Sequence, residues 1–256
     1  MADRVVVITG ADNGIGLSMT RELLASQYLV AALDLENRNL AELQQLYPDS
    51  LRVHICDVTD ETGIGKAVDM TVSEWGKIDI LVNNACLALF GGFEEKSLNE
   101  TRREFEVNYF GCLKMIRAVL PCMKKAGKGI IHNVSSGVGI TGFPGIYGYS
   151  STKGAIEALT RTLAIELARF GITVNLMHPP LTNTNSSAPL GIPKEAMESP
   201  ESVGRGLARK IESRKPIVTP GFKTWFGLFF CRHFPVAVGK ILAWMAGKSG
   251  KGEGKR

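Results

Sequence analysis

Twelve residues near the start of the chain read Val5-Val6-Val7-Ile8-Thr9-Gly10-Ala11-Asp12-Asn13-Gly14-Ile15-Gly16. The β-branched apolar run is typical of a central parallel strand, and the glycines lead into a helix that we expect to end near Ser26. A strand, a glycine-rich turn and a helix place backbone N–H groups and a helix N-terminus against a pyrophosphate. We therefore predict that Gly10 and residues 12–16 contact a dinucleotide. Gly10 would permit the turn, Gly14 the close approach, and Gly16 the packing of helix on strand.

The rest of the chain alternates between predicted strands and helices. Apolar runs predict strands at 28–33, 51–56, 79–82, 130–134, 172–177 and 217–218, and periodic segments predict helices at 38–46, 60–75, 98–124, 149–170 and 201–212. This order predicts an α/β fold with a single-domain, Rossmann-like, doubly wound parallel sheet and helices on both faces. We assign residues 1–220 to the dinucleotide-binding domain with its catalytic site, 221–247 to a hydrophobic extension of that domain, and 248–256 to a disordered basic tail.

The composition is that of an ordinary globular protein. Of 256 residues, 45% are apolar and 21% are charged, and the formal net charge is +5. From Arg205 onward, 12 Lys and Arg stand against Glu212 and Glu253. A basic C-terminal quarter suits an anionic surface or ligand, although solvated helix faces and a basic tail would give the same charge count. No element is typical of a nucleic-acid-binding module.

The five cysteines are an odd number without metal-like spacing, and they fall in apolar strand or helix patterns. We expect reduced, buried thiols and no metal site. The first strand is too short to be the apolar core of a secretory leader, and no apolar run is long enough to span a bilayer. These observations predict a cytoplasmic protein.

Asp34 follows the predicted second strand, about twenty residues after the glycines, where a carboxylate can bind both ribose hydroxyls of an adenosine. The same carboxylate would repel a 2′-phosphate. Leu35 follows it, and Arg38 is the one nearby cation. The sequence therefore favours NAD over NADP. The alternative is a strand-end carboxylate that simply faces water.

Ser136 lies just past the predicted strand 130–134, and Tyr149 and Lys153 lie four residues apart at the start of a helix. That spacing puts the phenol and the ammonium on one helix face. A phenol with a pKa of about 10 is a poor base at neutral pH. A neighbouring lysine favours the phenolate, and a serine hydroxyl can hold a substrate oxygen. Taken alone, the same residues also fit a buried tyrosine, a surface lysine and a loop serine.

Three further polar positions stand near predicted strand ends or inside a helix. Asp57 either contacts an adenine edge or caps the helix that begins near Asp60. Asn83 and Asn84 end the fourth strand, where their side chains can fix loop backbone beside a cofactor. Asn108 interrupts an apolar helical stretch, and its low helix propensity indicates a specific hydrogen-bonding role.

The segment after Pro220 is crowded with aromatic side chains. Phe, Trp and Leu residues at 222–234 are followed by an apolar stretch at 236–245, with a few cations between them. One interpretation is a helix pair that closes the substrate pocket. The other is a peripheral membrane element, residues 222–247, whose aromatics enter the lipid boundary. The Asn-, Ser- and Pro-rich segment 181–200 is expected to be a mobile loop over the site.

The order of these motifs resembles the short-chain dehydrogenase/reductase family across residues 4–220. The resemblance rests on the following positions: Thr9, Gly10, Gly14, Ile15, Gly16, Asp57, Asn83, Asn84, Ala85, Asn108, Ser136, Tyr149 and Lys153. It implies that Tyr149 is the general acid/base, that Lys153 lowers its pKa and binds the nicotinamide ribose, and that Ser136 orients the substrate. It also implies that Asn108 holds a water that relays protons through Lys153.

The resemblance extends to the cofactor contacts, with two departures from the family pattern. It implies that Asp57 and Val58 approach the adenine, that Asn84 and Ala85 border the cofactor, and that Pro179, Leu181 and Thr184 approach the carboxamide. Cys86 and Pro180 replace glycines of the family. Pro180 removes a backbone donor, but neither residue belongs to the acid/base set, so we expect altered geometry and retained chemistry.

The expected activity is an NAD(H)-dependent interconversion of a secondary alcohol and a ketone, on a hydrophobic substrate such as a steroid, retinoid or lipid. The alternatives are a 3-oxoacyl-thioester reductase that uses NADPH and a non-catalytic nucleotide-sensing scaffold. Family resemblance favours a homodimer or homotetramer.

Overall fold

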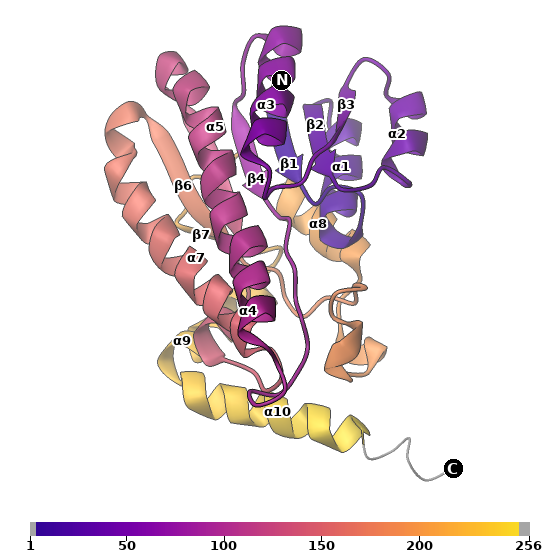
Figure 1. The fold of residues 1–256 in the computed structure, drawn as a ribbon, viewed down its shortest axis with the longest axis vertical. Coiled ribbons are helices and arrows are strands. Elements are labelled where there is room, and N and C mark those ends of the chain that lie inside the picture. Colours follow the sequence, from indigo (N-terminus) through magenta and orange to yellow (C-terminus); the bar gives the residue numbers. More distant parts are fainter. Residues whose placement is uncertain (1–3, 251–256) are drawn as a thin grey trace.

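The computed structural model describes residues 4–250, and their centre is a seven-stranded parallel sheet of order β3-β2-β1-β4-β5-β6-β7 (Figure 1). The strands are β1 (Val5–Thr9), β2 (Leu29–Asp34), β3 (Leu51–Ile55), β4 (Ile80–Asn83), β5 (Gly129–Val134), β6 (Ile172–Met177) and β7 (Ile217–Val218). All six strand pairs are parallel. The predicted fold class is therefore confirmed.

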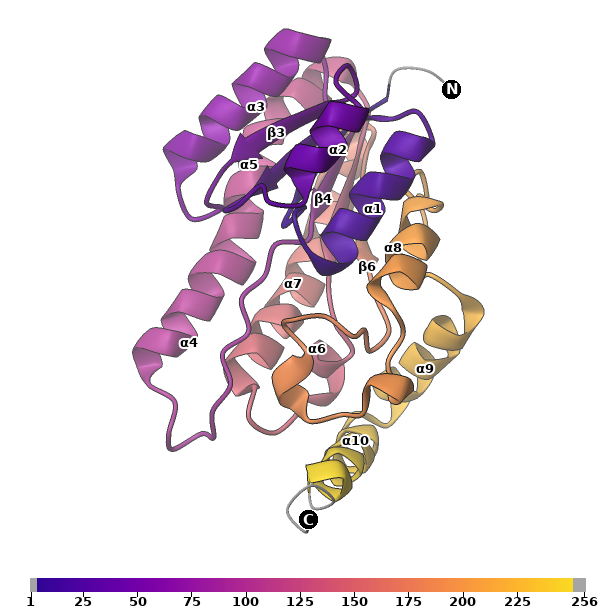
Figure 2. The same cartoon turned by 90° about the vertical axis from the view of Figure 1, so that its right-hand side faces the viewer.

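Helices cover both faces of the sheet (Figures 1 and 2). One layer contains α3 (Glu61–Trp75), α4 (Leu98–Phe105), α5 (Gly111–Ala126) and α7 (Tyr147–Glu166), and the other contains α1 (Gly14–Ala25), α2 (Leu40–Leu46) and α8 (Pro200–Ala208). The sequence of β1 explains the two layers. Val5 and Val7 belong to the core beneath α3 and α5, whereas Val6 and Ile8 belong to the core beneath α1 and α8. Successive strand side chains point to opposite faces, so a fully apolar strand requires cover on both.

The strand order reverses next to β1. From β1 the chain moves outward to β2 and β3, then returns to pair β4 with the other side of β1. Ligands of open α/β sheets bind in the crevice at such a switch point, outside the carboxyl ends of the strands. The glycine turn after β1 and the loop after β4 meet there.

The predicted helix 98–124 is three elements in the structure. The α4 helix passes into a π-helical turn, η1 (Glu106–Phe110), and then into α5. A single π turn inside a longer helix is commonly found at functional sites. Here it contains Asn108, the residue whose helix propensity is low.

Other boundaries also differ from the sequence-based expectation. The loop after β5 contains a short helix, α6 (Val138–Thr141), and 3₁₀ turns at Ala168–Phe170, Ala188–Leu190 and Lys194–Ala196 occupy segments predicted as helix end or loop. The C-terminal extension forms α9 (Phe222–His233) and α10 (Pro235–Gly250). Because α10 runs to Gly250, the predicted disorder from residue 248 is wrong for its first three residues. Residues 251–256 lie outside the described range.

Candidate active site

A cavity of about 1350 Å³ lies at the carboxyl ends of the strands. Its walls come from the glycine turn, the ends of β2, β4, β5 and β6, the segment after Pro179, and α9 and α10. The predicted site residues that line it are Gly10, Asn13, Gly14, Ile15, Asp34, Asp57, Val58, Asn84, Ala85, Ser136, Tyr149, Lys153, Pro179, Leu181 and Thr184. Small-molecule pockets are typically about 300–1,000 Å³. This cavity is therefore large enough for a dinucleotide and a second molecule.

The glycines of the turn are required by close backbone contacts. Gly10 has φ +64°, and a Cβ on it would lie 2.8 Å from Ala85 Cα. A Cβ on Gly16 would lie 2.0 Å from the Gly10 carbonyl oxygen. Gly14 has φ +54° and faces Thr184, whose Cγ2 would be 3.2 Å from an added Cβ. Gly16 thus packs the helix on the turn, as predicted, and does not line the cavity.

The Asn84 side chain joins the loop after β4 to the turn after β1. Its amide donates to the carbonyl oxygens of Thr9 at 3.0 Å and Gly10 at 2.9 Å. The Thr9 hydroxyl in turn accepts from the backbone N–H groups of Asn84 at 3.1 Å and Ala85 at 3.0 Å. Four hydrogen bonds therefore fix the two loops that border the switch point.

The Asp12 side chain joins the glycine turn to the start of α2. This side chain is fully buried and accepts from the backbone N–H groups of Asn39 at 2.9 Å and Leu40 at 2.8 Å, at the start of α2. The side chain therefore fixes the start of α2, and a cofactor contact by Asp12 stays a prediction. A carboxylate at a helix N-terminus satisfies donors that have no partner within the helix.

Asp34 borders the cavity at the end of β2, in a fixed orientation. One carboxylate oxygen accepts from Asp12 N–H at 2.7 Å and the other from Leu35 N–H at 2.7 Å. Arg38, the nearby cation, pairs instead with Glu36 at 2.9 Å. The negative charge of Asp34 therefore faces the cavity without a neutralising arginine.

The sequence left two roles open for Asp57, a contact with an adenine edge or the cap of the following helix. Asp60 is the N-cap of α3, where its side chain accepts from Thr62 N–H at 3.0 Å. Asp57 lines the cavity and accepts from Thr59 N–H at 2.8 Å. The helix cap is therefore Asp60, and Asp57 is available at the cavity wall.

Ser136, Tyr149 and Lys153 meet at one wall of the cavity. Lys153 is 3% exposed, donates to the Val134 carbonyl oxygen at 2.8 Å, and places its ammonium 5.5 Å from the centroid of the Tyr149 ring. Burial and the nearby Cys86 thiol raise the pKa of Tyr149, and the Ser136 hydroxyl acts in the opposite direction. The family resemblance implies that Lys153 lowers the pKa of Tyr149. The net shift in the structure is upward, because desolvation of the phenol is its largest cause.

The Asn108 side chain is held by three hydrogen bonds. It accepts from Leu87 N–H at 2.7 Å and donates to Leu87 C=O at 2.8 Å and to the Thr152 hydroxyl at 3.0 Å. The π turn that contains Asn108 is thereby attached to the loop after β4 and to the helix that bears Tyr149 and Lys153. The specific hydrogen-bonding role inferred from the helix propensity is confirmed.

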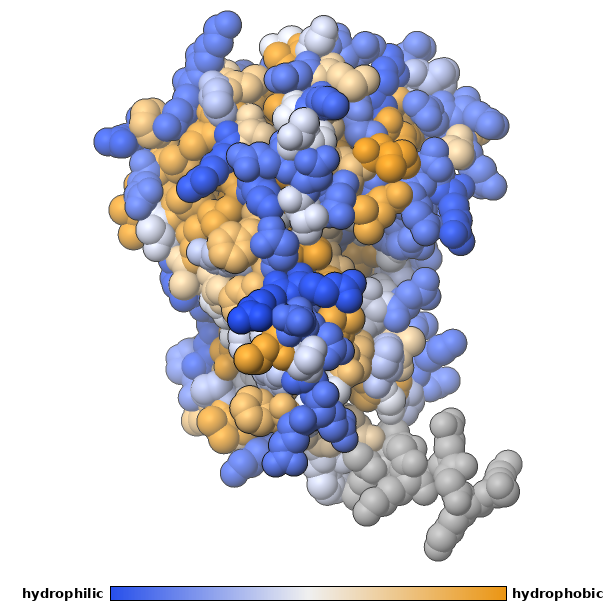
Figure 3. All heavy atoms as spheres, in the orientation of Figure 1, coloured by the Kyte–Doolittle hydropathy of each residue, from blue (hydrophilic) through white to orange (hydrophobic). Residues whose placement is uncertain are grey.

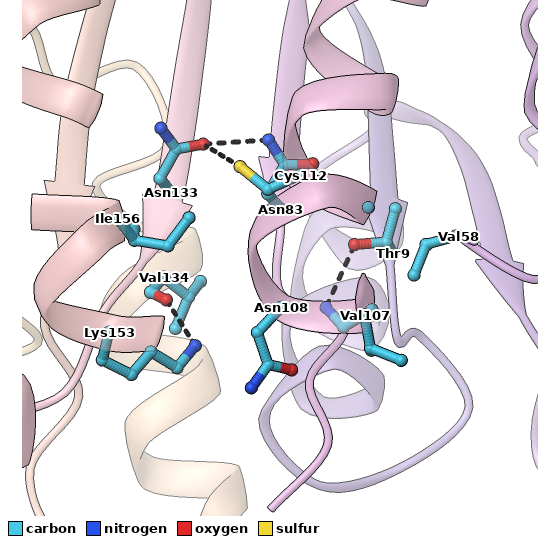
Figure 4. A pocket seen from close by; sticks show the side chains of 12 residues that line it. Thr9, Val58, Asn83, Val107, Asn108, Cys112, Asn133, Val134, Lys153 and Ile156 are labelled. Carbon is cyan, nitrogen blue, oxygen red and sulfur yellow. Dashed lines mark hydrogen bonds between the residues drawn. The ribbon is translucent and has the colours of Figure 1, made fainter. Parts of the chain in front are cut away.

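A small cavity of about 10 Å³ lies between Asn108 and Lys153 (Figure 4). Its walls include the side chains of Thr9 and Asn83. Asn83 Oδ1 is buried and has no hydrogen-bond partner among the described residues. A polar cavity of about this volume can hold one water.

Glu157 forms a buried cluster that the sequence analysis missed. One oxygen accepts from the Ser135 hydroxyl at 3.0 Å and lies 2.6 Å from His178 Nε2, and the other is 3.0 Å from Arg232 and 3.2 Å from Arg161. The cluster joins the loop before Ser136, the end of β6, α7 and α9. The spacing of Lys153, Glu157 and Arg161 along one helix face was the available signal.

The two departures from the family pattern both face the large cavity. Cys86 is exposed there, beside Tyr149, so the prediction of buried thiols is wrong for this residue. Cys56 and Cys112 are buried, and Cys122 and Cys231 are half-buried. Pro180 lines the cavity, and its carbonyl accepts from the Thr182 hydroxyl at 2.8 Å.

Comparison with known proteins agrees with this geometry. The sequence model described as short chain dehydrogenase matches residues 4–194. The oxidoreductase YusZ of Bacillus subtilis is 38% identical over 187 residues, which are 70% of this chain and 65% of that protein. A 3-alpha-(or 20-beta)-hydroxysteroid dehydrogenase of Mycobacterium bovis is 37% identical over 182 residues, 71% of this chain and 70% of that protein.

Solved structures share the whole architecture. A short-chain dehydrogenase from Streptomyces avermitilis has a TM-score of 0.80 at 27% identity, covering 100% of this chain and 99% of that one. A 3-ketoacyl-(acyl-carrier-protein) reductase from Brucella melitensis, complexed with NADH, has a TM-score of 0.76 at 27% identity, covering 85% and 94%. A gluconate 5-dehydrogenase from Burkholderia cenocepacia, in complex with NADP and tartrate, has a TM-score of 0.75 at 25% identity, covering 86% and 89%.

Proposed function

The chain belongs to the short-chain dehydrogenase/reductase family, and we propose that it interconverts a secondary alcohol and a ketone with NAD(H). The observation that carries the proposal is the meeting of Ser136, Tyr149 and Lys153 at the wall of a cavity that begins at the glycine turn. The bound nicotinamide would supply or accept the hydride. The protein's part is to bind, to orient and to move a proton.

The turn after β1 fits a dinucleotide. Gly10 and Gly14 leave no side chain on the backbone where a pyrophosphate would lie, and α1 starts at Gly14 with its N-terminus toward the cavity. Asp34, Asp57 and Val58 line the cavity, where Asp34 would accept hydrogen bonds from ribose hydroxyls and Asp57 and Val58 would approach the adenine. The fixed Asp34 carboxylate and the Arg38–Glu36 pair favour NAD over NADP.

Tyr149 is assigned as the proton donor for ketone reduction. A phenol with a raised pKa is neutral at neutral pH and retains a proton to donate. Ser136 would hold the substrate oxygen, and Lys153 would favour the phenolate as it forms. Asn108 and Asn83 would hold a water in the small cavity that returns the proton by way of Lys153.

A hydrophobic substrate fits the remainder of the cavity. Its lining there is largely apolar and comes from widely separated segments: Leu87, Phe90, Val138, Phe143, Leu190, Ile192, Leu228, Phe230, Val238 and Leu242. One relative is named a hydroxysteroid dehydrogenase, which supports a bulky secondary alcohol or ketone. We infer a steroid-, retinoid- or lipid-like molecule for this chain.

A homodimer or homotetramer is also part of the proposal. Large apolar side chains are exposed on the helical layer that contains α5 and α7, among them Phe110 of η1 and Ile165 of α7. Such a surface suits a second copy of the chain. Light scattering of the purified protein measures the assembly directly, and a monomer at micromolar concentration would contradict it.

Replacing Tyr149 with phenylalanine tests the catalytic assignment. Tyr149→Phe should lower turnover of a panel of hydrophobic secondary alcohols by at least about 100-fold, since general acid–base catalysis contributes typically about 10²–10⁴-fold. NADH binding, followed by cofactor fluorescence, should change little. Tyr147→Phe is the matched control, because the Tyr147 phenol bonds to Thr101 at 3.1 Å and does not line the cavity. Retained turnover in Tyr149→Phe would refute the role.

A second candidate is a 3-oxoacyl-thioester reductase that uses NADPH, favoured by the fold shared with the Brucella melitensis reductase. Faster reduction of acetoacetyl-CoA with NADPH than of cyclic ketones with NADH would select it. A nucleotide-sensing scaffold without catalysis would bind NADH and turn over none of these substrates.

A further inference from the structure

The C-terminal helix pair presents an unusual concentration of apolar side chains to solvent. Of the 19 exposed large hydrophobic residues in the described part of the chain, nine belong to α9 and α10, and a tenth, Phe234, links the two helices. They are Phe222, Trp225, Phe226, Phe229, Phe230, Phe234, Val236, Ile241, Trp244 and Met245. Scattered exposed apolar residues are normal, but a contiguous patch marks an interaction site. Figure 3 shows apolar side chains at the surface at this end of the molecule, among hydrophilic ones.

The α9 helix is apolar on both of its faces. Leu228 and Cys231 point into the large cavity. On the opposite side, Phe222, Trp225 and Phe229 are 74%, 50% and 45% exposed. The Phe222 ring stacks on Trp225 with centroids 5.7 Å apart, so the outer face is an ordered aromatic surface. An aromatic face that the described residues leave open marks a site of interaction.

The α10 helix lies across the end of the molecule, beside α6 and α9 (Figure 2). Gly239 packs directly on α6, because a Cβ there would lie 2.7 Å from the Thr141 carbonyl oxygen. Val238 and Leu242 line the cavity, whereas Val236 and Ile241 are 65% and 57% exposed. Each helix therefore has one apolar face on the cavity and another on the outside.

The two helices meet at a bend of 116°. Within the described residues no single helix meets the length and hydropathy of a membrane span, and these two meet them only as a bent pair. A bent pair with one face held by the protein and the other apolar is suited to lie in an interface. The geometry does not require it to cross one.

Charge decides which partner this surface fits. Between residues 213 and 252 the sequence has no Asp or Glu. Lys223 and Lys240 are exposed on the helix pair, and Arg232 is paired with Glu157. A two-fold pairing of this face with a second copy would bring like charges together, whereas anionic lipid head groups complement them. We propose that α9 and α10 dock the protein on an anionic lipid bilayer, with the outer aromatics in the lipid boundary.

The same geometry places the substrate cavity next to the bilayer. Phe230 lines the cavity and is also 41% exposed, so the cavity wall and the docking surface share this side chain. A hydrophobic substrate dissolved in lipid would then reach the cavity between α9 and α10 without crossing water. This part of the inference rests on the proposed function, whereas the docking itself does not.

Vesicle co-sedimentation of the full chain tests the docking. The probes are vesicles of phosphatidylcholine alone and of phosphatidylcholine with phosphatidylglycerol. The wild type should sediment with the anionic vesicles, less at high salt, and less with the neutral ones. The triple variant Phe222→Ser, Trp225→Ser, Phe229→Ser should lose at least about tenfold in partitioning, because the removed side chains carry the apolar contact.

Two controls keep the result specific. The variant Leu46→Ser, Ile55→Ser, Met70→Ser removes three apolar side chains of comparable exposure far from α9, and it should sediment like the wild type. Tyr149→Phe should also sediment like the wild type, which separates docking from catalysis.

A fluorescence measurement locates the contact. In a Trp75→Phe background, brominated lipids should quench the fluorescence of the remaining tryptophans, Trp225 and Trp244.

Three outcomes would overturn the proposal. One is wild type that stays in the supernatant with anionic vesicles. Another is a triple serine variant that binds as well as the wild type. The third is a triple variant that changes the protein from dimer to monomer by light scattering while neither form binds vesicles, which would assign the patch to a second copy of the chain.

Discussion

Replacing Glu157 with glutamine removes one negative charge from the buried cluster and leaves its shape almost unchanged. The wild-type carboxylate is 4% exposed and is surrounded by Ser135, His178, Arg161 and Arg232. Glutamine retains one carbonyl oxygen but brings an NH₂ group into a site with several donors. At least one of these donors is left without an acceptor.

The expected loss of stability follows from the burial of the partners. The Arg161 side chain is 59% exposed and Arg232 is 33% exposed, so each surface-type pair contributes at most about 1 kcal/mol. The buried Ser135 contact is a hydrogen bond to a charged group, which contributes about 1.5–3 kcal/mol before partial replacement by the amide, and the buried His178 ring lies 2.6 Å from the same oxygen. We expect Glu157→Gln to lower the free energy of unfolding by about 3 kcal/mol. For a chain of this length that is a decrease in Tm of about 6–12 °C.

The same substitution changes the dependence of stability on pH. Burial alone would raise the pKa of Glu157, but hydrogen bonding and attraction from His178, the Arg232 charge and the Ser135 hydroxyl outweigh it, so the pKa is lowered. A lowered pKa in the folded state contributes stability that is fully present above the unfolded value, near ~4.3. That contribution is lost as the pH falls through the folded-state pKa. The difference between wild type and Glu157→Gln should therefore be largest at neutral pH and shrink below about pH 4.

Urea denaturation followed by circular dichroism at a series of pH values measures this difference. Arg161→Ala is the matched control, since it removes one exposed partner from the same carboxylate and should cost no more than about 1 kcal/mol. A Glu157→Gln protein as stable as the wild type at neutral pH would refute the reasoning. So would a stability difference that is the same at neutral and acid pH.

Three other predictions concern the cofactor end, the phenol and the C-terminal helix. Asp34→Ala should raise KM for NAD about 10–100-fold with little change in kcat, because a hydrogen bond to a charged group is worth about 1.5–3 kcal/mol. Steady-state kinetics with NAD and NADP measure this change in KM. An unchanged KM for NAD would contradict the prediction. In the cofactor-free protein, Tyr149 should stay protonated through about pH 10, because its pKa is raised. Wild type and Tyr149→Phe should therefore show equal tyrosinate absorbance on titration to that pH. A smaller rise of this absorbance in the variant would contradict the raised pKa. Gly239→Val should loosen α10 from α6, because a Cβ would lie 2.7 Å from Thr141 C=O, and hydrogen exchange should rise in α10 and not in the sheet.

The sheet and its order of elements were accessible from the sequence because each strand is an apolar run bounded by a clear turn. Local patterns also placed the start of α3 near Asp60 and singled out the unusual Asn108. They did not reveal the π turn around Asn108, since that turn depends on hydrogen bonds to Leu87 and Thr152, which are 21 and 44 residues away. A helix boundary set by distant partners leaves no periodic signal nearby.

The site was predictable where one element supplies the geometry and less so where several elements converge. Tyr149 and Lys153 share a helix face, so their spacing was sufficient. The hydrogen bonds of the Asp12 side chain were not predicted, because its partners, Asn39 and Leu40, are 27 and 28 residues away in sequence. Glu157 was missed for the same reason, because Arg232 is 75 residues away. The raised pKa of Tyr149 could not be inferred from Lys153 alone, because it follows from burial in the folded chain.

The contact between Arg232 and Glu157 has a practical meaning for anyone who shortens this chain to make it easier to handle. Cutting before Phe222 would delete the exposed apolar side chains of α9 and α10 and also Arg232, one of the two arginines paired with Glu157, which lies one helical turn from Lys153. It would also remove Leu228 and Leu242, which form part of the wall of the large cavity. The large cavity of the shortened protein would be open to solvent on the side that α9 and α10 now close. Kinetic constants of the shortened protein would therefore not describe the full chain.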